Sequence, residues 1–418
     1  MKTAILTIGD EICIGQIVNT NAAWMAAELT RLGIAVEQHS TVGDEDDVIS
    51  AELARLLQTA DAVLITGGLG PTHDDRTKAV LTAFFDDHLV EDAATLQFLR
   101  DLLARRGLEL TERQREQALV PSRARVLTNE HGTAPGMLFE TAAGKIVVSM
   151  PGVPAEMKHM MTRDVLPLLR ERSAADPVNM YRTLLSAGIA EANLADLVGE
   201  PEEFLGGATL AFLPSVQGVR LRIGVRAANR AAGEGHLNNI EAELMARAGA
   251  YIYGRDEESL AFKVGQLLNK RGLTLAVAES CTGGLLGGAI TDIAGSSAWF
   301  LGGVLSYSNE VKQAQLGVKA ETLATHGAVS RQTACEMAQG VRNLIGADLS
   351  LSVTGVAGPG GGSEEKPVGT VWIGLASAER VVAKHFLFLK DRRVNRERSV
   401  AAALTMLMRE LTRTTAQG

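Results

Sequence analysis

Residues 274–284 read Thr-Leu-Ala-Val-Ala-Glu-Ser-Cys-Thr-Gly-Gly, an apolar run followed by a serine and a pair of glycines. The apolar run predicts a short buried strand, and the glycines predict a tight turn into a helix. A strand that leads into a helix is the repeating unit of a parallel sheet covered by helices. Ser280 stands at the corner of this turn, where a serine is either a nucleophile or simply a helix cap. For a nucleophile, we expect the unpaired N–H groups of the helix start to stabilise the oxyanion.

The same alternation of strand and helix continues on both sides of this turn. In the last third we expect strands at 303–307, 349–354 and 370–376, with helices at 332–344 and 396–410. The first third predicts strands at 4–8, 35–40, 62–66 and 145–149, with helices at 21–32 and 47–58. The predicted fold class is α/β: two three-layer α/β domains with mainly parallel sheets, joined by a small α+β domain.

The polar stretch around 171–177 ends in a proline and marks a domain boundary. We predict domains at 1–172, 173–254 and 255–418. In the middle domain we expect a helix at 191–198 and strands at 209–213 and 219–226. This domain carries no concentration of reactive side chains, so we interpret it as a spacer or a dimerisation domain. A chain of 418 residues is long enough for several cores.

Composition narrows the function classes. The net charge of −8 and the lack of a basic, aromatic-rich cluster make direct nucleic-acid binding an unfavoured hypothesis. The three cysteines are widely spaced and form neither a disulfide framework nor a zinc motif. No apolar run is long enough to cross a membrane. A cytoplasmic protein is the expectation.

A serine nucleophile needs a base, and the last third has no histidine in a motif-like context. Lys312, in the stretch Tyr-Ser-Asn-Glu-Val-Lys, is the better candidate, because a partly buried lysine loses its proton more easily. The alternative is an exposed helical lysine. Tyr307 either packs in the core or offers its hydroxyl to a site.

Two further segments suggest phosphate binding. Thr354 opens a glycine-rich loop through Gly362, which either holds an anion with backbone N–H groups or is a flexible turn. The run Asp-Arg-Arg-Val-Asn-Arg at 391–396 lies at a predicted helix start, where an arginine would grip a phosphate with two N–H groups. The alternative is a solvated helix face.

These motifs together closely resemble the CinA C-terminal domain, a family that includes nicotinamide-nucleotide amidases. The resemblance implies hydrolysis of nicotinamide mononucleotide to nicotinic acid mononucleotide and ammonia, without a cofactor. It implies Ser280 as nucleophile, Lys312 as base and Tyr307 as a third catalytic residue. The substrate-binding residues it implies in this domain are Thr282, Gly283, Gly284, Asn309, Thr354, Gly355, Gly358, Arg392 and Arg396.

The first third places glycines and carboxylates after its predicted strands, where parallel sheets bind ligands. Gly-Asp-Glu follows the first strand, Asp44 the second, and Thr-Gly-Gly-Leu-Gly-Pro-Thr-His-Asp-Asp the third. Glycines allow phosphates to approach closely, and aspartates hold divalent cations. Alternatively, each acid is a helix cap or a solvated turn residue. The predicted site residues are Gly67, Gly68 and Gly70 for substrate, and Asp10, Asp44, Asp74 and Asp75 for metal.

This region, with the segments 129–136 and 151–157, resembles the MoaB/MogA-like molybdopterin-binding domain in the version found at the front of CinA proteins. In that version the resemblance implies a pyrophosphatase that uses Mg²⁺ or a similar metal to cleave ADP-ribose to AMP and ribose 5-phosphate. The leading hypothesis is a bifunctional salvage enzyme, acting as a homodimer. The alternatives are an amidase with a non-catalytic nucleotide-binding domain, and a non-catalytic adaptor linked to competence.

Overall fold

The computed structural model describes residues 1–418 except 73–74, 106, 175, 390 and 414–418. The chain forms two compact units. Unit 1 comprises Met1–Tyr181 and Val225–His236, and unit 2 comprises Arg182–Gly224 and Leu237–Gly418. The predicted three-domain boundaries stay a prediction.

Unit 1 is built on a six-stranded sheet of order β2-β1-β3-β8-β7-β6. The four strands from β2 to β8 run parallel, and β7 and β6 are antiparallel additions at one edge. A separate antiparallel pair joins β4 to β5. The strands are β1 Lys2–Ile8, β2 Ala35–Val42, β3 Ala62–Thr66, β4 Leu89–Glu91, β5 Leu119–Pro121, β6 Arg125–Leu127, β7 Gly136–Glu140 and β8 Ile146–Met150.

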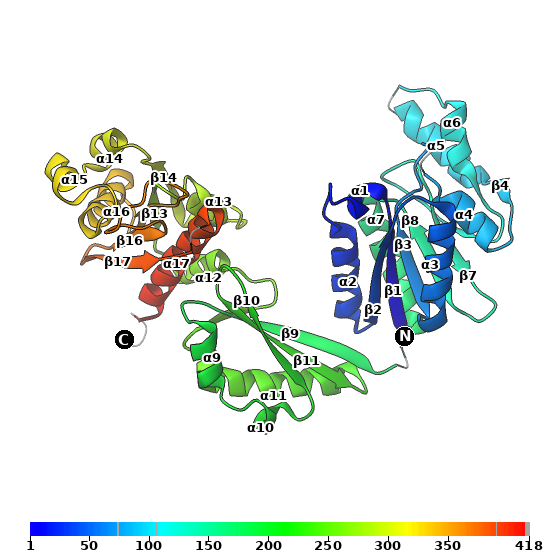
Figure 1. Cartoon of the computed structure of the whole chain (residues 1–418), viewed down its shortest axis with the longest axis horizontal. Coiled ribbons are helices and arrows are strands. Elements are labelled where there is room, and N and C mark those ends of the chain that lie inside the picture. The colour runs from blue at the N-terminus through cyan, green and yellow to red at the C-terminus, as the bar shows by residue number, and fades with distance from the viewer. Residues whose placement is uncertain (73–74, 106, 175, 390, 414–418) are drawn as a thin grey trace. The chain divides into compact units, whose positions relative to one another are not determined.

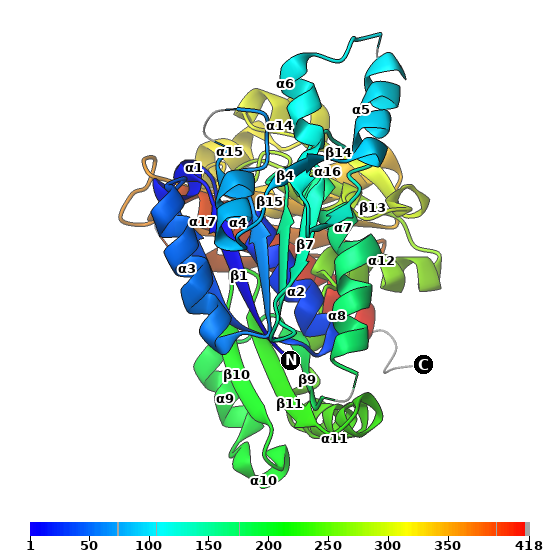
Figure 2. The same cartoon turned by 90° about the vertical axis from the view of Figure 1, so that its right-hand side faces the viewer.

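Helices cover both faces of this sheet. Along β1, Ile5 packs with α2 and α7 on one face, while Leu6 and Ile8 pack with α3 on the other. Because alternate side chains of a strand point to opposite faces and both faces are covered, every residue of β1 from Thr3 to Ile8 is buried, including the polar Thr3 and Thr7. In Figure 2, α3 and α8 lie on opposite sides of β1. The helices are α1 Asp10–Cys13, α2 Thr20–Leu32, α3 Asp46–Thr59, α4 Thr77–Phe84, α5 Ala93–Arg105, α6 Glu112–Arg115, η1 Glu116–Ala118, α7 Pro154–Met160, η2 Met161–Val165 and α8 Leu166–Arg172.

The middle of the chain forms a four-stranded sheet of order β10-β11-β9-β12. The predicted helix at 191–198 is α9, and the predicted strands fall on β10 and β11. The long helix α11 was not predicted. The elements are β9 Val178–Ser186, α9 Glu191–Val198, α10 Glu202–Leu205, β10 Thr209–Pro214, β11 Val219–Ala227, α11 Arg230–Ala248 and β12 Ile252–Arg255.

The rest of unit 2 is a five-stranded sheet of order β14-β13-β15-β16-β17. The first three strands are parallel, and β16 and β17 are antiparallel. In Figure 1, α14, α15 and α16 lie on one side of this sheet and α17 and α12 on the other. The strands are β13 Leu275–Glu279, β14 Phe300–Leu305, β15 Leu349–Gly355, β16 Thr370–Ala376 and β17 Val381–Leu387. The helices are α12 Leu260–Arg271, α13 Leu285–Thr291, η3 Ser296–Ala298, α14 Asn309–Leu316, α15 Ala320–His326, α16 Arg331–Ile345 and α17 Arg392–Arg413.

The predicted α/β fold class is confirmed. Each large sheet has a parallel part, which was expected, and an antiparallel pair at one edge, which was not.

Candidate active sites

Ser280 and Lys312 meet at the end of the parallel strands of unit 2. Ser280 directly follows β13, and Lys312 lies on the first turn of α14, which follows the neighbouring strand β14. Lys312 Nζ lies 3.1 Å from Ser280 Oγ. The lysine is 1% exposed and the serine 8% exposed. Sequence reasoning proposed both residues, and the fold brings them into hydrogen-bond contact.

Two backbone carbonyls complete the surroundings of the amine. Lys312 Nζ donates to the carbonyl of Ser306 at 2.7 Å and to that of Tyr307 at 3.2 Å. A neutral amine has two N–H donors and one lone pair. In the structure, Nζ also donates to Ser280 Oγ. Once the amine is neutral, the two carbonyls would take both donors and the lone pair would accept from the Ser280 hydroxyl. The carbonyl of Ser306 was not among the predicted site groups, because a backbone contact leaves no side-chain signature.

Burial also favours the neutral form of the lysine. Desolvation lowers the pKa of Lys312 from its usual value of 10.5, against smaller opposing effects of Cys281 and Glu310. The neighbouring thiol behaves differently, since burial raises the pKa of Cys281 to about 11. Cys281 thus stays a protonated, poorly nucleophilic thiol at neutral pH. Of the two neighbouring residues Ser280 and Cys281, the contact with Lys312 therefore supports Ser280 as the nucleophile.

Glu279 is a site residue that sequence reasoning missed. Its carboxylate is 2% exposed and accepts hydrogen bonds from the N–H groups of Gly284 and Leu286 at 3.0 Å and of Gly287 at 2.8 Å. It therefore caps α13, which begins at Leu285, five residues after the nucleophile. A glutamate at the end of an apolar strand gave only a weak sequence signal, because its role depends on the turn folding back.

This cap changes the expected source of oxyanion stabilisation. The helix-terminal N–H groups, predicted to hold the oxyanion, are instead bound by Glu279. Within the turn, the N–H groups of Cys281 and Thr282 have no backbone acceptor among the described residues. A reaction at Ser280 would therefore rely on the amides immediately after the nucleophile.

The first turn of α17 holds the loops around this site. Arg396 donates from Nη2 to the carbonyl of Thr282 at 2.8 Å. Arg392 donates from Nη1 to the carbonyl of Gly358 at 2.6 Å, and Asn395 donates to Ala357 at 3.0 Å. The two predicted arginines therefore lie at the site, bound to the glycine-rich turns. Asn395, which is buried between them, was not predicted.

The other predicted residues of this domain lie around the pair. Gly283 and Gly284 both adopt left-handed backbone conformations, with φ of 59° and 95°, which side chains disfavour. The Thr282 hydroxyl is buried and has no hydrogen-bond partner among the described residues. Thr354 is buried and its hydroxyl donates to the carbonyl of Ala328, with Gly355 ending β15 beside it.

Two predicted residues differ from the rest in exposure. The side chain of Tyr307 is 67% exposed, and only its carbonyl contacts Lys312. Asn309 is exposed and begins α14 after the cap Ser308. Both lie next to the site in sequence, at its solvent-facing rim.

Unit 1 has a pocket of about 480 Å³ at the ends of its parallel strands. The segments after β1, β2, β3 and β8 all contribute to it, including the predicted Asp44, Gly67, Gly68, Gly70 and Asp75. Gly67 has φ of 113°, and a Cβ there would lie 2.0 Å from the carbonyl oxygen of Ile8. Only glycine fits at this position, because the backbone at the end of β1 lies so close. The close approach of a phosphate to these glycines stays a prediction.

The pocket is lined by acids. Its carboxylates are Glu11, Asp44, Asp75 and Glu156, and none of the described lining residues is lysine, arginine or histidine. Asp10 is not in the lining, and its N–H donates to Asp44 at 3.0 Å. Asp74 falls outside the described residues.

The acidic lining fits a divalent cation better than a bare anion. Among the described residues, no three acids, histidines or cysteines form a ready metal cluster. Mg²⁺ is commonly held by one or two carboxylates together with substrate phosphates. Asp44 and Asp75 fit that role. Asp75 is pre-oriented, since its Oδ2 accepts from the N–H of Thr72 at 2.9 Å.

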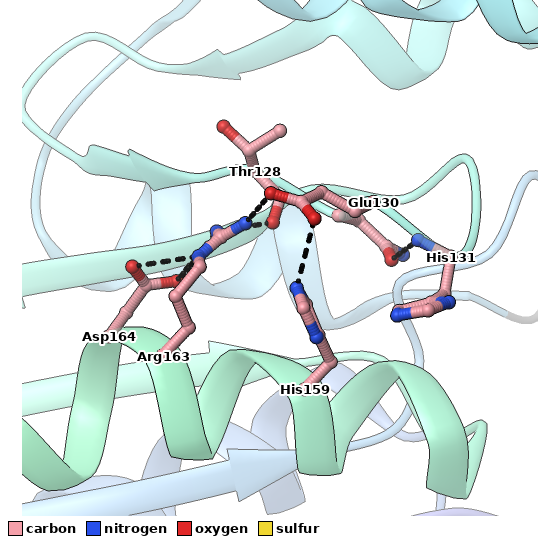
Figure 3. Close-up of polar contacts among 7 residues, drawn as sticks. Thr128, Glu130, His131, His159, Arg163 and Asp164 are labelled. Atoms are coloured by element: carbon pink, nitrogen blue, oxygen red, sulfur yellow. Dashed lines mark hydrogen bonds and ion pairs between the residues drawn. The ribbon is translucent and has the colours of Figure 1, made fainter.

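A polar network holds the loop residues 128–131 (Figure 3), which lie just before the pocket-lining Thr133 and Ala134. Asn129 is buried and donates to the pocket carboxylate of Glu156 at 2.6 Å. Arg163 donates to Glu130 at 2.5 Å and to the carbonyl of Thr128 at 2.7 Å. His159 lies 3.3 Å from Glu130. These contacts tie the loop to the helices after β8.

The fold and the two sites define a multidomain α/β protein, with a buried Ser–Lys pair in one domain and an acidic, glycine-lined pocket in another. Three family models match: "Probable molybdopterin binding domain" over residues 4–171, "Damage-inducible protein CinA KH domain" over 181–254 and "CinA C-terminal domain" over 257–411. The chain belongs to the CinA family.

Full-length relatives support this membership. A CinA-like protein of Chloroherpeton thalassium is 46% identical, covering 98% of this chain and 99% of its own. One of Gemmatimonas aurantiaca is 44% identical, covering 99% and 97%. A solved competence/damage inducible protein from Agrobacterium tumefaciens is 44% identical, covering 37% of this chain and 93% of that one, with a TM-score of 0.36.

Within the part of the chain that the structure describes, we find no helix with the length and apolar character needed to span a bilayer.

Proposed function

We propose that the C-terminal domain is an amidohydrolase that converts nicotinamide mononucleotide to nicotinic acid mononucleotide and ammonia. The observation that carries this proposal is the buried amine of Lys312, 3.1 Å from Ser280 Oγ with two carbonyls on its other side. That arrangement supports a lysine base and a serine nucleophile.

The chemistry follows from these contacts. Lys312 takes the proton of the Ser280 hydroxyl as Oγ bonds to the carboxamide carbon. The resulting ammonium returns the proton to the leaving nitrogen, so that ammonia departs and an acyl ester remains on Ser280. Water then attacks the ester carbon, Lys312 accepts one of its protons, and Ser280 leaves as the hydroxyl. The carboxylate product keeps one oxygen from water.

The arginines of α17 support recognition of the substrate phosphate. Each guanidinium has five N–H donors. Arg396 and Arg392 spend some of theirs on the carbonyls of Thr282 and Gly358. Their positive charge lies beside the glycine turns, where it would attract the phosphate of a mononucleotide.

For the N-terminal domain we propose hydrolysis of ADP-ribose to AMP and ribose 5-phosphate. The support is a pocket of about 480 Å³ that combines close-packed glycines with four carboxylates. Asp44 and Asp75 would hold the divalent metal, which would neutralise the diphosphate and activate water. The family membership fits this pairing of domains, and a cytoplasmic homodimer is part of the proposal.

A second candidate is an amidase whose N-terminal domain binds a nucleotide without cleaving it. The lack of a ready metal cluster among the described residues favours it. A metal-dependent release of AMP from ADP-ribose by the full chain would decide against it.

The test of the amidase is ammonia release from nicotinamide mononucleotide by wild type, Ser280→Ala and the matched control Ser308→Ala. Ser308 caps α14 at the surface. We expect Ser280→Ala to lose at least about 10⁴-fold in kcat, as for other serine nucleophiles, with ADP-ribose cleavage unchanged. Ser308→Ala should keep most of the activity. Full ammonia release by Ser280→Ala would contradict the assignment.

A further inference from the structure

Unit 2 contains a pocket that the proposed amidase does not use and that is larger than the pocket of unit 1. Its volume is about 760 Å³, within the size range of small-molecule sites. One wall is the C-terminal two thirds of α17 together with β17. The other is formed by the loop 188–191 before α9 and the turn 214–219 between β10 and β11.

The β17 wall is aromatic. Phe386 and Phe388 point to the same face of the strand, and their rings are stacked with centroids 5.6 Å apart and planes at 16°. The amine of Lys384, two residues earlier on the same face, lies 5.4 Å from the Phe386 ring centroid. The strand thus offers flat apolar surface with a positive charge at one end, which suits a planar ring.

The α17 wall contributes a cation. Arg398 lines the pocket and is half-buried. Among the described residues, none accepts a hydrogen bond from its guanidinium or pairs with it. Two other charged residues of the lining are engaged, since Arg409 donates to the carbonyl of Gly188 at 3.1 Å and Glu410 pairs with Arg380. The N–H donors of Arg398 are therefore available to an anion that enters the pocket.

We propose that this pocket binds a planar aromatic ring bearing a phosphate, that is, a mononucleotide. The ring stacks on Phe386 and Phe388, and the phosphate pairs with Arg398 and Lys384. The volume of about 760 Å³ favours a small molecule over a polynucleotide strand, which needs an extended groove. This site is independent of both proposed reactions.

The test is isothermal titration of the full chain with AMP, alongside adenosine and ribose 5-phosphate, which lack the phosphate and the ring respectively. AMP should bind saturably and at least about tenfold more tightly than either, since one stacked base and one charge-assisted contact each contribute on that scale. Hydrogen exchange should show AMP-dependent protection in peptides covering 381–389 and 398–409.

Matched variants separate the pocket from the surface around it. Phe386→Ala and Arg398→Gln should each remove this protection and weaken the corresponding binding event at least about tenfold. The controls are Leu387→Ala, on the opposite face of the strand, and Arg393→Gln, an exposed arginine of the same helix. Both controls should keep the binding. Protection confined to the unit 1 pocket, equal loss in the controls, or no saturable AMP binding would each overturn the proposal.

Discussion

The two candidate active sites differ in how much of their chemistry is already assembled. In unit 2, Ser280 and Lys312 are buried and in contact, and backbone carbonyls hold the amine. In unit 1, the pocket places four carboxylates together without a cationic residue among the described lining. At the first site, burial lowers the pKa of Lys312 and so favours the neutral amine. The second concentrates negative charge, so an anionic substrate needs a cation to enter.

Of the changes that separate the two sites, replacing the base Lys312 should lower the rate of deamidation most. Lys312→Met keeps the apolar stem and removes the amine, so deamidation should fall about 10³-fold while ADP-ribose cleavage stays unchanged. Lys319→Met, at the exposed start of α15, is the control. A Lys312→Met enzyme with near wild-type deamidation would leave Ser280 without its proposed base.

The same lysine fixes the direction of the pH dependence. Only the neutral amine accepts a proton, and burial lowers its pKa below 10.5. The kcat/KM for deamidation should therefore rise with pH and level off above the folded-state pKa of Lys312. The inflection should lie below 10.5, and a rate that falls between neutral pH and pH 9 would contradict this.

Replacing Glu279 should lower the rate of deamidation by an intermediate amount, because its proposed role is to position the turn after Ser280 rather than to contact the substrate. Glu279→Gln keeps the shape, but it removes the charge and turns an amide group toward backbone N–H donors. We expect kcat for deamidation to fall about 10²-fold with a smaller change in KM. Unfolding free energy should fall by about 1–3 kcal/mol.

Glu279→Asp separates position from charge. The shorter carboxylate retains the charge and should recover part of kcat. Equal loss of kcat and stability in both variants, with no recovery, would reduce Glu279 to a structural role.

The candidate sites also show which contacts between site residues can be predicted from the sequence. Ser280 and Thr354 lie at the ends of the neighbouring parallel strands β13 and β15, and Lys312 lies on the helix that follows β14, the other neighbour of β13. Segments that follow neighbouring parallel strands lie at the same edge of the sheet. Local patterns therefore predicted that they would meet. The contact from Arg396 to the carbonyl of Thr282 joins residues 114 positions apart, and no local pattern predicts which donor a carbonyl will find.

Other features were missed for different physical reasons. Glu279 acts through the path of the turn after it, which sequence does not specify. The helix α11 contains Gly233 and Gly235 near its start, and glycine is a poor helix former. Packing of Leu237, Ile240 and Leu244 into the core outweighs that preference.

A smaller effect is expected at the N-terminal pocket. Asp75→Asn should raise the Mg²⁺ concentration for half-maximal ADP-ribose cleavage at least about tenfold, because one anionic ligand is lost. Asp47→Asn, an exposed acid on α3, is the control. A chelator should stop this reaction and spare deamidation. Inhibition of both reactions by the chelator would contradict the difference between the two sites.

The smallest effect on deamidation is expected from Tyr307, an exposed residue that lies close in sequence to the buried Lys312. Its side chain is 67% exposed, while its carbonyl makes the contact to Lys312. Tyr307→Phe keeps that carbonyl and removes only the hydroxyl. If the hydroxyl takes no part in the reaction, kcat/KM for deamidation should change less than about threefold. Ser306→Ala offers the same comparison inside the site, since it too retains its carbonyl. A loss of 10²-fold or more in Tyr307→Phe would instead show that the hydroxyl takes part in the reaction, and that the exposed rim closes over the substrate.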